Sequence, residues 1–130
     1  MKIGIFAMLL ISISIATAQR IFAQPTACIP QFQGRKFVSM DELLALESIS
    51  VCNDAEKVDA IIRFNIIVIQ KDRDPALSLS SFSQLITQDM REILANTDPW
   101  NDIKVIFEYI RVRLKDGNEI TLPSFEIETR

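Results

Sequence analysis

The segment from Val58 to Gln70 constrains the fold more than any other part of the sequence. Its even-numbered positions from Val58 to Val68 are all apolar, whereas its odd-numbered positions mix Asp59, Arg63 and Asn65 with isoleucines. Alternation with a period of two residues and many β-branched side chains predict a long strand with one face in a core. Because its far end is apolar on both faces, we expect a second layer or a partner to cover that end.

A second alternating segment predicts the neighbouring strands. Apolar residues occupy odd positions from Ile103 to Phe107 and even positions from Ile110 to Leu114. One extra residue near Glu108-Tyr109 would keep both sets on one face, which predicts a β-bulge there. Asp116-Gly117 predicts a hairpin turn. The partner strand is expected over Ile120 to Glu128, with Leu122 and Phe125 pointing inward and Pro123 marking an edge or a break.

Two short helices are predicted beside these strands. Ser39-Met40-Asp41-Glu42 is a capping box, which predicts a helix of about two turns. Thr87 is a candidate N-cap for a second helix that ends before Asn96 to Pro99, and the serine-rich stretch Ser78 to Ser83 is expected to be a loop. Residues 35–130 are therefore predicted to form one mainly β, antiparallel β-sandwich-like domain with two short α-helices.

Residues 1–18 have the organisation of a signal peptide. Lys2 precedes an apolar run, and Ala16-Thr17-Ala18 offers a cleavage site between Ala18 and Gln19, with a second one after Ala23. The run from Ile3 to Ala18 is shorter than the roughly 20 residues that a membrane-spanning helix needs, which disfavours an uncleaved anchor. A lipoprotein modified at Cys28 is a further alternative. Residues 19–34 are expected to be a loose N-terminal arm, which a bond at Cys28 would tie down, and the protein is expected to be periplasmic or secreted.

The two cysteines, Cys28 and Cys52, lie 24 positions apart. In an oxidising compartment such a pair most simply forms one structural disulfide, which would stabilise the domain by roughly 3 kcal/mol. Two buried free thiols remain the alternative. A redox role is disfavoured because the C-x-x-C spacing is missing.

Composition excludes several classes of enzyme. The 130 residues contain no histidine, so Ser-His-Asp and Cys-His catalysis are impossible, and two cysteines cannot complete a closed zinc site. Only three glycines are present, so a glycine-rich phosphate loop is not expected. The net charge of −3 becomes −4 when Lys2 is removed with the signal peptide, which gives no basis for nucleic-acid binding. No catalytic, cofactor-binding or metal-ligating residue is predicted, and the protein is expected not to be an enzyme.

Trp100 and Tyr109 are the candidate interface residues, because exposed aromatic side chains often anchor protein contacts. The alternative for each is ordinary packing in the core or at a sheet edge. The rival function is a small ligand-binding protein or a carboxylate-dependent hydrolase, for which the sequence supplies acids but no pair at a defined spacing.

From Val58 onward, the order of motifs resembles the C-terminal domain of the gliding-motility-associated protein GldM family. The resemblance rests on Arg63-Phe64-Asn65-Ile66, Leu85-Ile86-Thr87, the segment Ile103 to Ile110, Lys115-Asp116-Gly117 and Leu122-Pro123-Ser124-Phe125. It implies a non-enzymatic, β-sandwich-like end domain of the envelope shafts that serve type IX secretion and gliding in Bacteroidetes. The sequence differs from the family in its cysteine pair and in Asp98-Pro99-Trp100-Asn101, where the family has a Pro-Gly turn.

The resemblance also implies the partners. They would be envelope proteins, including ring components of the secretion and gliding machinery, and a homodimer is a further expectation. Because the family's membrane helix and shaft domains are missing from the sequence, we expect an adaptor or accessory rather than a motor-coupled rod. No nucleic-acid partner is expected, and no membrane span is expected after signal cleavage.

Overall fold

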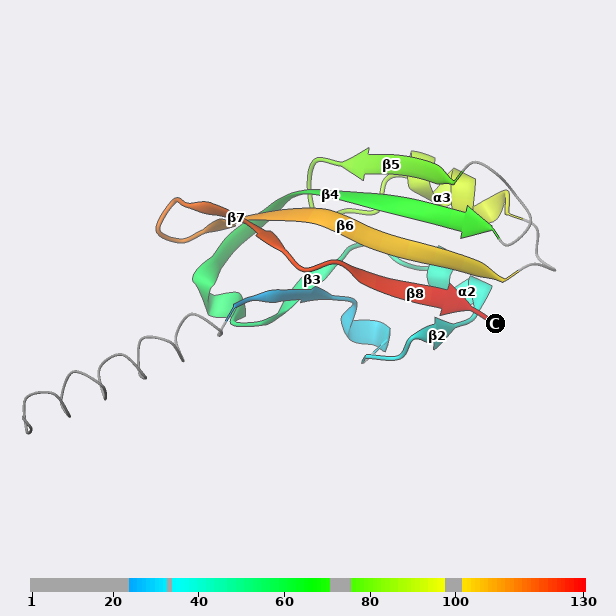
Figure 1. The fold of residues 1–130 in the computed structure, drawn as a ribbon, viewed down its shortest axis with the longest axis horizontal. Coiled ribbons are helices and arrows are strands. Elements are labelled where there is room, and N and C mark those ends of the chain that lie inside the picture. The colour runs from blue at the N-terminus through cyan, green and yellow to red at the C-terminus, as the bar shows by residue number, and fades with distance from the viewer. Residues whose placement is uncertain (1–23, 33, 71–75, 98–101) are drawn as a thin grey trace, which may run out of the picture.

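The two alternating segments form the centre of a six-stranded sheet. A computed structural model describes residues 24–32, 34–70, 76–97 and 102–130, and Figure 1 shows β4 (Val58–Gln70) beside β6 (Ile103–Leu114). The strand order is β2-β8-β6-β4-β5, and β7 also pairs with β6. All of these pairs are antiparallel except β2–β8. The remaining strands of the sheet are β2 (Phe37–Val38), β5 (Leu77–Ser81), β7 (Glu119–Leu122) and β8 (Phe125–Thr129).

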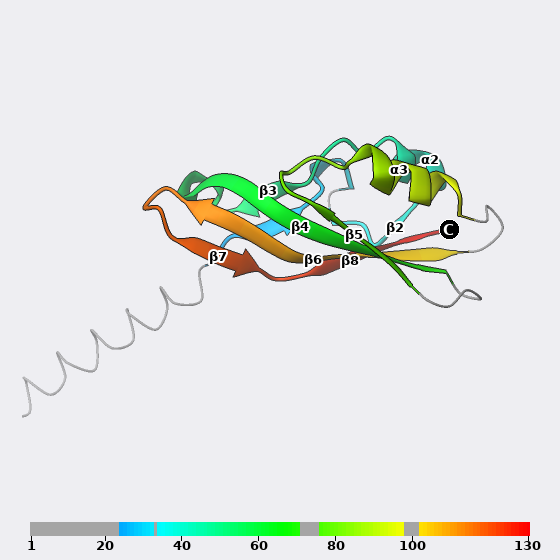
Figure 2. The ribbon, with the colours of Figure 1, turned by 90° about the horizontal axis from the view of Figure 1, so that it is seen from above.

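A second layer covers one face of this sheet. It contains the two-stranded sheet of β1 (Thr26–Cys28) and β3 (Ser50–Asn53), together with α2 (Met40–Leu44) and α3 (Gln88–Ala95). Figure 2 shows these elements on the same side of the large sheet. Short 3-10 turns, η1 (Pro30–Phe32) and η2 (Ala55–Lys57), lie between the strands. The expected mainly β, sandwich-like fold with two short helices is thus confirmed. No helix in the described ranges is long and apolar enough to cross a membrane.

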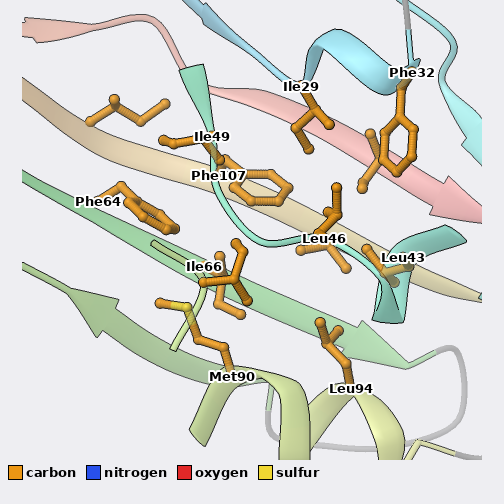
Figure 3. Close-up of a cluster of buried hydrophobic side chains, with 14 of the residues drawn as sticks. Ile29, Phe32, Leu43, Leu46, Ile49, Phe64, Ile66, Met90, Leu94 and Phe107 are labelled. Atoms are coloured by element: carbon orange, nitrogen blue, oxygen red, sulfur yellow. The ribbon is translucent and has the colours of Figure 1, made fainter. Parts of the chain in front are cut away.

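The core lies between the two layers. Phe64 and Ile66 of β4 and Phe107 of β6 are fully buried, and Leu43 of α2 and Met90 of α3 pack from the opposite layer (Figure 3). The Phe107 ring stacks on that of Phe125, with centroids 4.6 Å apart. The inward direction predicted for Phe125 is therefore confirmed.

Residues 24–32, which belong to the predicted loose arm, are held against the rest of the domain. Within residues 24–32, β1 pairs with β3, and both Ile29 and Phe32 are buried in the core. Burial of Ile29 and Phe32 holds this otherwise polar segment against the sheet, and β3 supplies the partners for the backbone hydrogen bonds of β1. The signal-peptide residues, including Ala18 and Gln19, lie outside the described residues.

Irregularities divide the central strand pair into two parts. Asn65 of β4 pairs with Glu108 of β6, and Arg63 pairs with Arg111, so between these pairs one residue of β4 faces two residues of β6. The bulge predicted near Glu108-Tyr109 is thus confirmed. The first half of β4 contains two further register shifts, and there Ile61 is buried instead of the even-numbered neighbours expected to face the core. A bulge inverts the alternation of the residues that follow it.

The Ser78 to Ser83 stretch is not the loop that we expected, because Leu77 to Ser81 form the strand β5. Its backbone pairs with β4 over five consecutive residues, from Phe64 opposite Ser81 to Val68 opposite Leu77. Its serines alternate with leucines, so the strand presents a polar face outward and an apolar face inward. Serine is compatible with a strand, because its small side chain causes no clash and its backbone N–H can still donate to the neighbouring strand. The edge of β4 therefore determines that these residues pair as a strand.

The predicted caps and turn have the expected geometry. The Ser39 hydroxyl accepts from the Glu42 amide, and the Glu42 carboxylate accepts from the Ser39 amide, both at 3.1 Å. Thr87 caps α3 by accepting from the Met90 amide at 3.2 Å. At the tip of the β6–β7 hairpin, Asp116 accepts from the Asn118 amide at 2.9 Å.

Candidate interaction surface

The bulge in β6 turns Tyr109 out of the sheet. Tyr109 has φ = 48°, in the left-handed region that side chains larger than glycine rarely adopt, and its side chain is 62% exposed. Its neighbour Ile110 is fully buried. The left-handed conformation of Tyr109 costs about 1–2 kcal/mol of stability. Because it keeps Ile110 in the core, the burial of Ile110 offsets this cost. Such strained, exposed residues are concentrated at functional sites.

Two arginines lie beside Tyr109 on the outer face. Arg63 and Arg111 are directly opposite each other on β4 and β6, an arrangement that is electrostatically unfavourable unless other groups compensate it. The Arg111 guanidinium lies 3.4 Å from the Glu119 carboxylate and donates to the Thr121 hydroxyl at 3.4 Å. Within the described ranges no carboxylate pairs with Arg63. Its guanidinium instead lies 5.5 Å from the centroid of the Phe82 ring.

These side chains surround a shallow hollow of about 310 Å³, lined by Arg63, Asn65, Tyr109, Arg111 and Thr121. We call these five residues together with Phe82 the Tyr109 surface. Phe82 is 76% exposed and follows directly on β5, so the surface reaches the edge of the sheet. Exposed tyrosine and arginine side chains are the types most often found at the energetic centre of protein interfaces. The lining carries no carboxylate, thiol or metal ligand, and its chemistry is that of hydrogen bonding and aromatic contact.

The remaining outer face combines isoleucines with ion pairs. Ile67 lies opposite Ile106, and the neighbouring position pairs Ile69 with Lys104. Lys104 lies 3.6 Å from Glu128, and Lys36 lies 3.4 Å from Glu126. On the outer face at this end of β4, Ile67 is half-buried and Ile69 is 37% exposed, although the apolar residues on both faces predicted a covering layer or partner. The second layer covers only the inner face, as Figure 2 shows.

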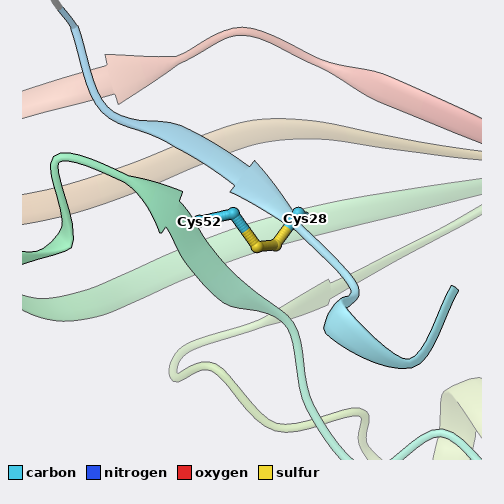
Figure 4. The surroundings of a disulfide bond; sticks show 2 residues. All are labelled: Cys28 and Cys52. Atoms are coloured by element: carbon cyan, nitrogen blue, oxygen red, sulfur yellow. A yellow bond between two sulfur atoms is a disulfide. The ribbon is translucent and has the colours of Figure 1, made fainter. Parts of the chain in front are cut away.

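The cysteine pair forms the predicted disulfide. Cys28 at the end of β1 and Cys52 in β3 are bonded, with their Cα atoms 5.8 Å apart (Figure 4). The alternative of two free thiols is wrong. Beside the disulfide lies a second hollow of about 360 Å³, whose wall includes Ile29, Phe32, Phe125 and Ile127, with Arg35 and Lys36 also lining it.

One carboxyl group in the described part of the chain has a clearly shifted pKa. The Arg35 guanidinium donates to Glu42 and, together with the Ser39 amide, lowers the pKa of that carboxyl below its ordinary value. The contact between Glu42 and Ser39 is the capping box of α2, and none of these three residues belongs to the Tyr109 surface. No group of three or more cysteine and acidic side chains that could hold a metal ion is found within residues 24–32, 34–70, 76–97 and 102–130.

The two aromatic residues singled out from the sequence have different outcomes. Tyr109 is exposed, as an interface residue must be, whereas Trp100 lies outside the described residues. Sequence reasoning missed Arg63, Arg111 and Phe82. The predicted bulge was the available signal for the arginines, because an extra residue at Tyr109 brings Arg111 opposite Arg63. Phe82 gave no signal, because its serine-rich segment was expected to be a loop.

No family model matches the chain, and no curated protein matches it. The resemblance to the GldM C-terminal domain therefore stays a prediction from the sequence.

Proposed function

We propose that this chain is an exported, non-enzymatic protein-interaction module whose contact site is the Tyr109 surface. The observation that carries the proposal is an exposed tyrosine held in a left-handed conformation beside two opposed arginines. A like-charge pair costs stability, and a partner that contacts the guanidinium groups would compensate for that cost, while the bulge presents the Tyr109 ring to the same partner.

The proposed setting is the bacterial envelope. A disulfide-bonded domain preceded by a segment of signal-peptide type supports export to the periplasm or beyond. The sequence resemblance supports an adaptor or accessory role in type IX secretion or gliding, with ring components as the proposed partners. A second copy of the chain is an additional proposed partner.

The test is capture of partners by tagged protein from the native envelope after mild cross-linking. Tyr109→Asn removes the ring but keeps a residue that tolerates positive φ, so the bulge is expected to persist. Phe37→Asn is the matched control, because Phe37 is an exposed aromatic residue on β2, at the other edge of the sheet. We expect recovery of secretion or gliding ring proteins by the wild type and by Phe37→Asn, but not by Tyr109→Asn.

Equal capture by all three proteins would reject the Tyr109 surface as the contact site. Recovery of unrelated envelope proteins alone, or of this chain alone, would reject the secretion and gliding context.

A second function, binding of a small apolar ligand, is favoured by the hollow beside the disulfide. Its volume of about 360 Å³ lies within the range of small-molecule sites, and its wall is largely apolar. The test is thermal unfolding with and without medium-chain fatty acids, for which Ala27→Leu narrows the hollow. A rise in Tm with ligand that Ala27→Leu abolishes would support this function, and an unchanged Tm would reject it.

A further inference from the structure

The strand β5 is an edge of the large sheet that the described residues leave unpaired on its outer side. It lies at one end of the strand order, and β4 alone pairs with it. Its five residues pair with β4 without a register shift. A regular edge strand presents backbone donors and acceptors on which a further strand can form.

Within the described residues, this edge lacks the devices that usually prevent such pairing. Residues 75 to 88 include no charged residue, and β5 itself contains neither lysine nor proline. Two large apolar side chains are exposed in this strand or directly after it: Leu77 is 44% exposed and Phe82 76%. The opposite edge, β2, is only two residues long and directly follows Arg35 and Lys36, which is the usual protection of an edge.

We propose that β5 of a second copy of this chain adds antiparallel to this edge, around a two-fold axis through Leu79. In that register Leu79 lies opposite its own copy, Leu77 lies opposite Ser81, and Ser78 lies opposite Ser80. Residues 77, 79 and 81 face inward, whereas Ser78 and Ser80 face outward. In this register, inward-facing residues therefore pair with inward-facing residues, and the outward-facing serines pair with each other. The two large sheets then form one continuous sheet.

Electrostatics and apolar contact support this occupant. The charge-free segment places no like charges opposite each other across the axis, although each chain is acidic overall. Beyond the strand, the same register brings Phe82 opposite Ala76 of the copy, a large side chain against a small one. The inference gives the homodimer of the proposed function its interface, but it does not require that the Tyr109 surface bind any partner.

The first measurement is sedimentation equilibrium of the full exported chain over a range of concentrations. We expect a monomer–dimer equilibrium with a dissociation constant between about 1 μM and 1 mM. Ser78→Lys puts a charge on the outer face of the edge and should raise that constant roughly tenfold or more, because the change enters the interface twice. Ser124→Lys is the matched control, since Ser124 is exposed between β7 and β8, and it should leave the constant unchanged.

The second measurement is hydrogen exchange of the peptide spanning residues 76–84 in dilute and concentrated wild-type protein. Slower exchange of β5 amides at high concentration is the expected result. A monomer at about 0.5 mM would overturn the proposal. A dimer that Ser78→Lys leaves intact, or one without added protection of β5, would equally overturn it. Neither result depends on capture of envelope partners by Tyr109, so failure of this interface is distinguishable from failure of the proposed function.

Discussion

Removal of the Cys28–Cys52 disulfide gives the sharpest test of how the N-terminal segment is held. The bond closes a loop with a sequence separation of 24, for which the chain-entropy relation gives about 3.5 kcal/mol of stabilisation. Neither cysteine is fully buried, so serine at both positions introduces no buried polar group. Three-residue pairing of β1 with β3 and the burial of Ile29 and Phe32 remain to hold the segment. We therefore expect a folded but weaker domain.

The assay is urea unfolding of the wild type and of the Cys28→Ser/Cys52→Ser double variant, each with and without reductant. The expected loss is about 3.5 kcal/mol, with a fall in Tm of more than about 10 °C. Reductant should lower the stability of the wild type to that of the variant and should leave the variant unchanged. A loss below about 1 kcal/mol would refute the reasoning, because it would mean that the reduced unfolded chain is already constrained.

Three other predictions concern the core, a cap and a pH dependence. Phe107→Ala should lower the free energy of unfolding by about 3–5 kcal/mol, because the ring is buried and stacks on that of Phe125. Ile106→Ala, on the outer face of the sheet, should lower it less. Equal losses of stability in urea unfolding would contradict the assignment of the two faces. Ser39→Ala should cost about 1 kcal/mol in the same assay by removing a capping box, and an unchanged stability would contradict this role. Because the pKa of Glu42 is lowered, the ionised carboxylate contributes to folding stability above pH 4.5, its ordinary pKa, and this contribution is lost as the pH falls through the folded-state pKa. Arg35→Ala should make the stability fall less on acidification. Identical profiles of stability against pH for the wild type and Arg35→Ala would contradict the pairing.

The sequence predicted those elements whose signal is local. The period of Val58 to Gln70 identified β4, and the change of phase between Phe107 and Ile110 located the bulge. A capping box consists of residues three positions apart, so Ser39 and Glu42 could be recognised directly. These features depend on neighbours along the chain, and a single sequence contains all the information that they need.

The sequence did not predict elements that depend on distant partners. Leu77 to Ser81 have weak strand preference, and the unpaired edge of β4 makes them a strand. Ile29 and Phe32 look isolated in the sequence, but the disulfide and β3 bring them over the sheet. Similarly, nothing near Arg63 along the chain indicates Phe82, because the end of β5 brings the two side chains together, whereas the bulge at Tyr109 was the signal for Arg111.

The distribution of charge explains why both proposed contact surfaces lie at one corner of the sheet. Toward β2 the outer face is crossed by ion pairs between Lys36 or Lys104 and the glutamates of β8, which remain hydrated and disfavour burial. Toward β5, the strand itself contains no charged residue, and among the described side chains Arg63 lies against the Phe82 ring. Phe82 therefore belongs to both surfaces. If a second copy buries Phe82, the Arg63 guanidinium loses its water on that side and gains from a carboxylate partner, so association at the edge and binding at the Tyr109 surface should be coupled.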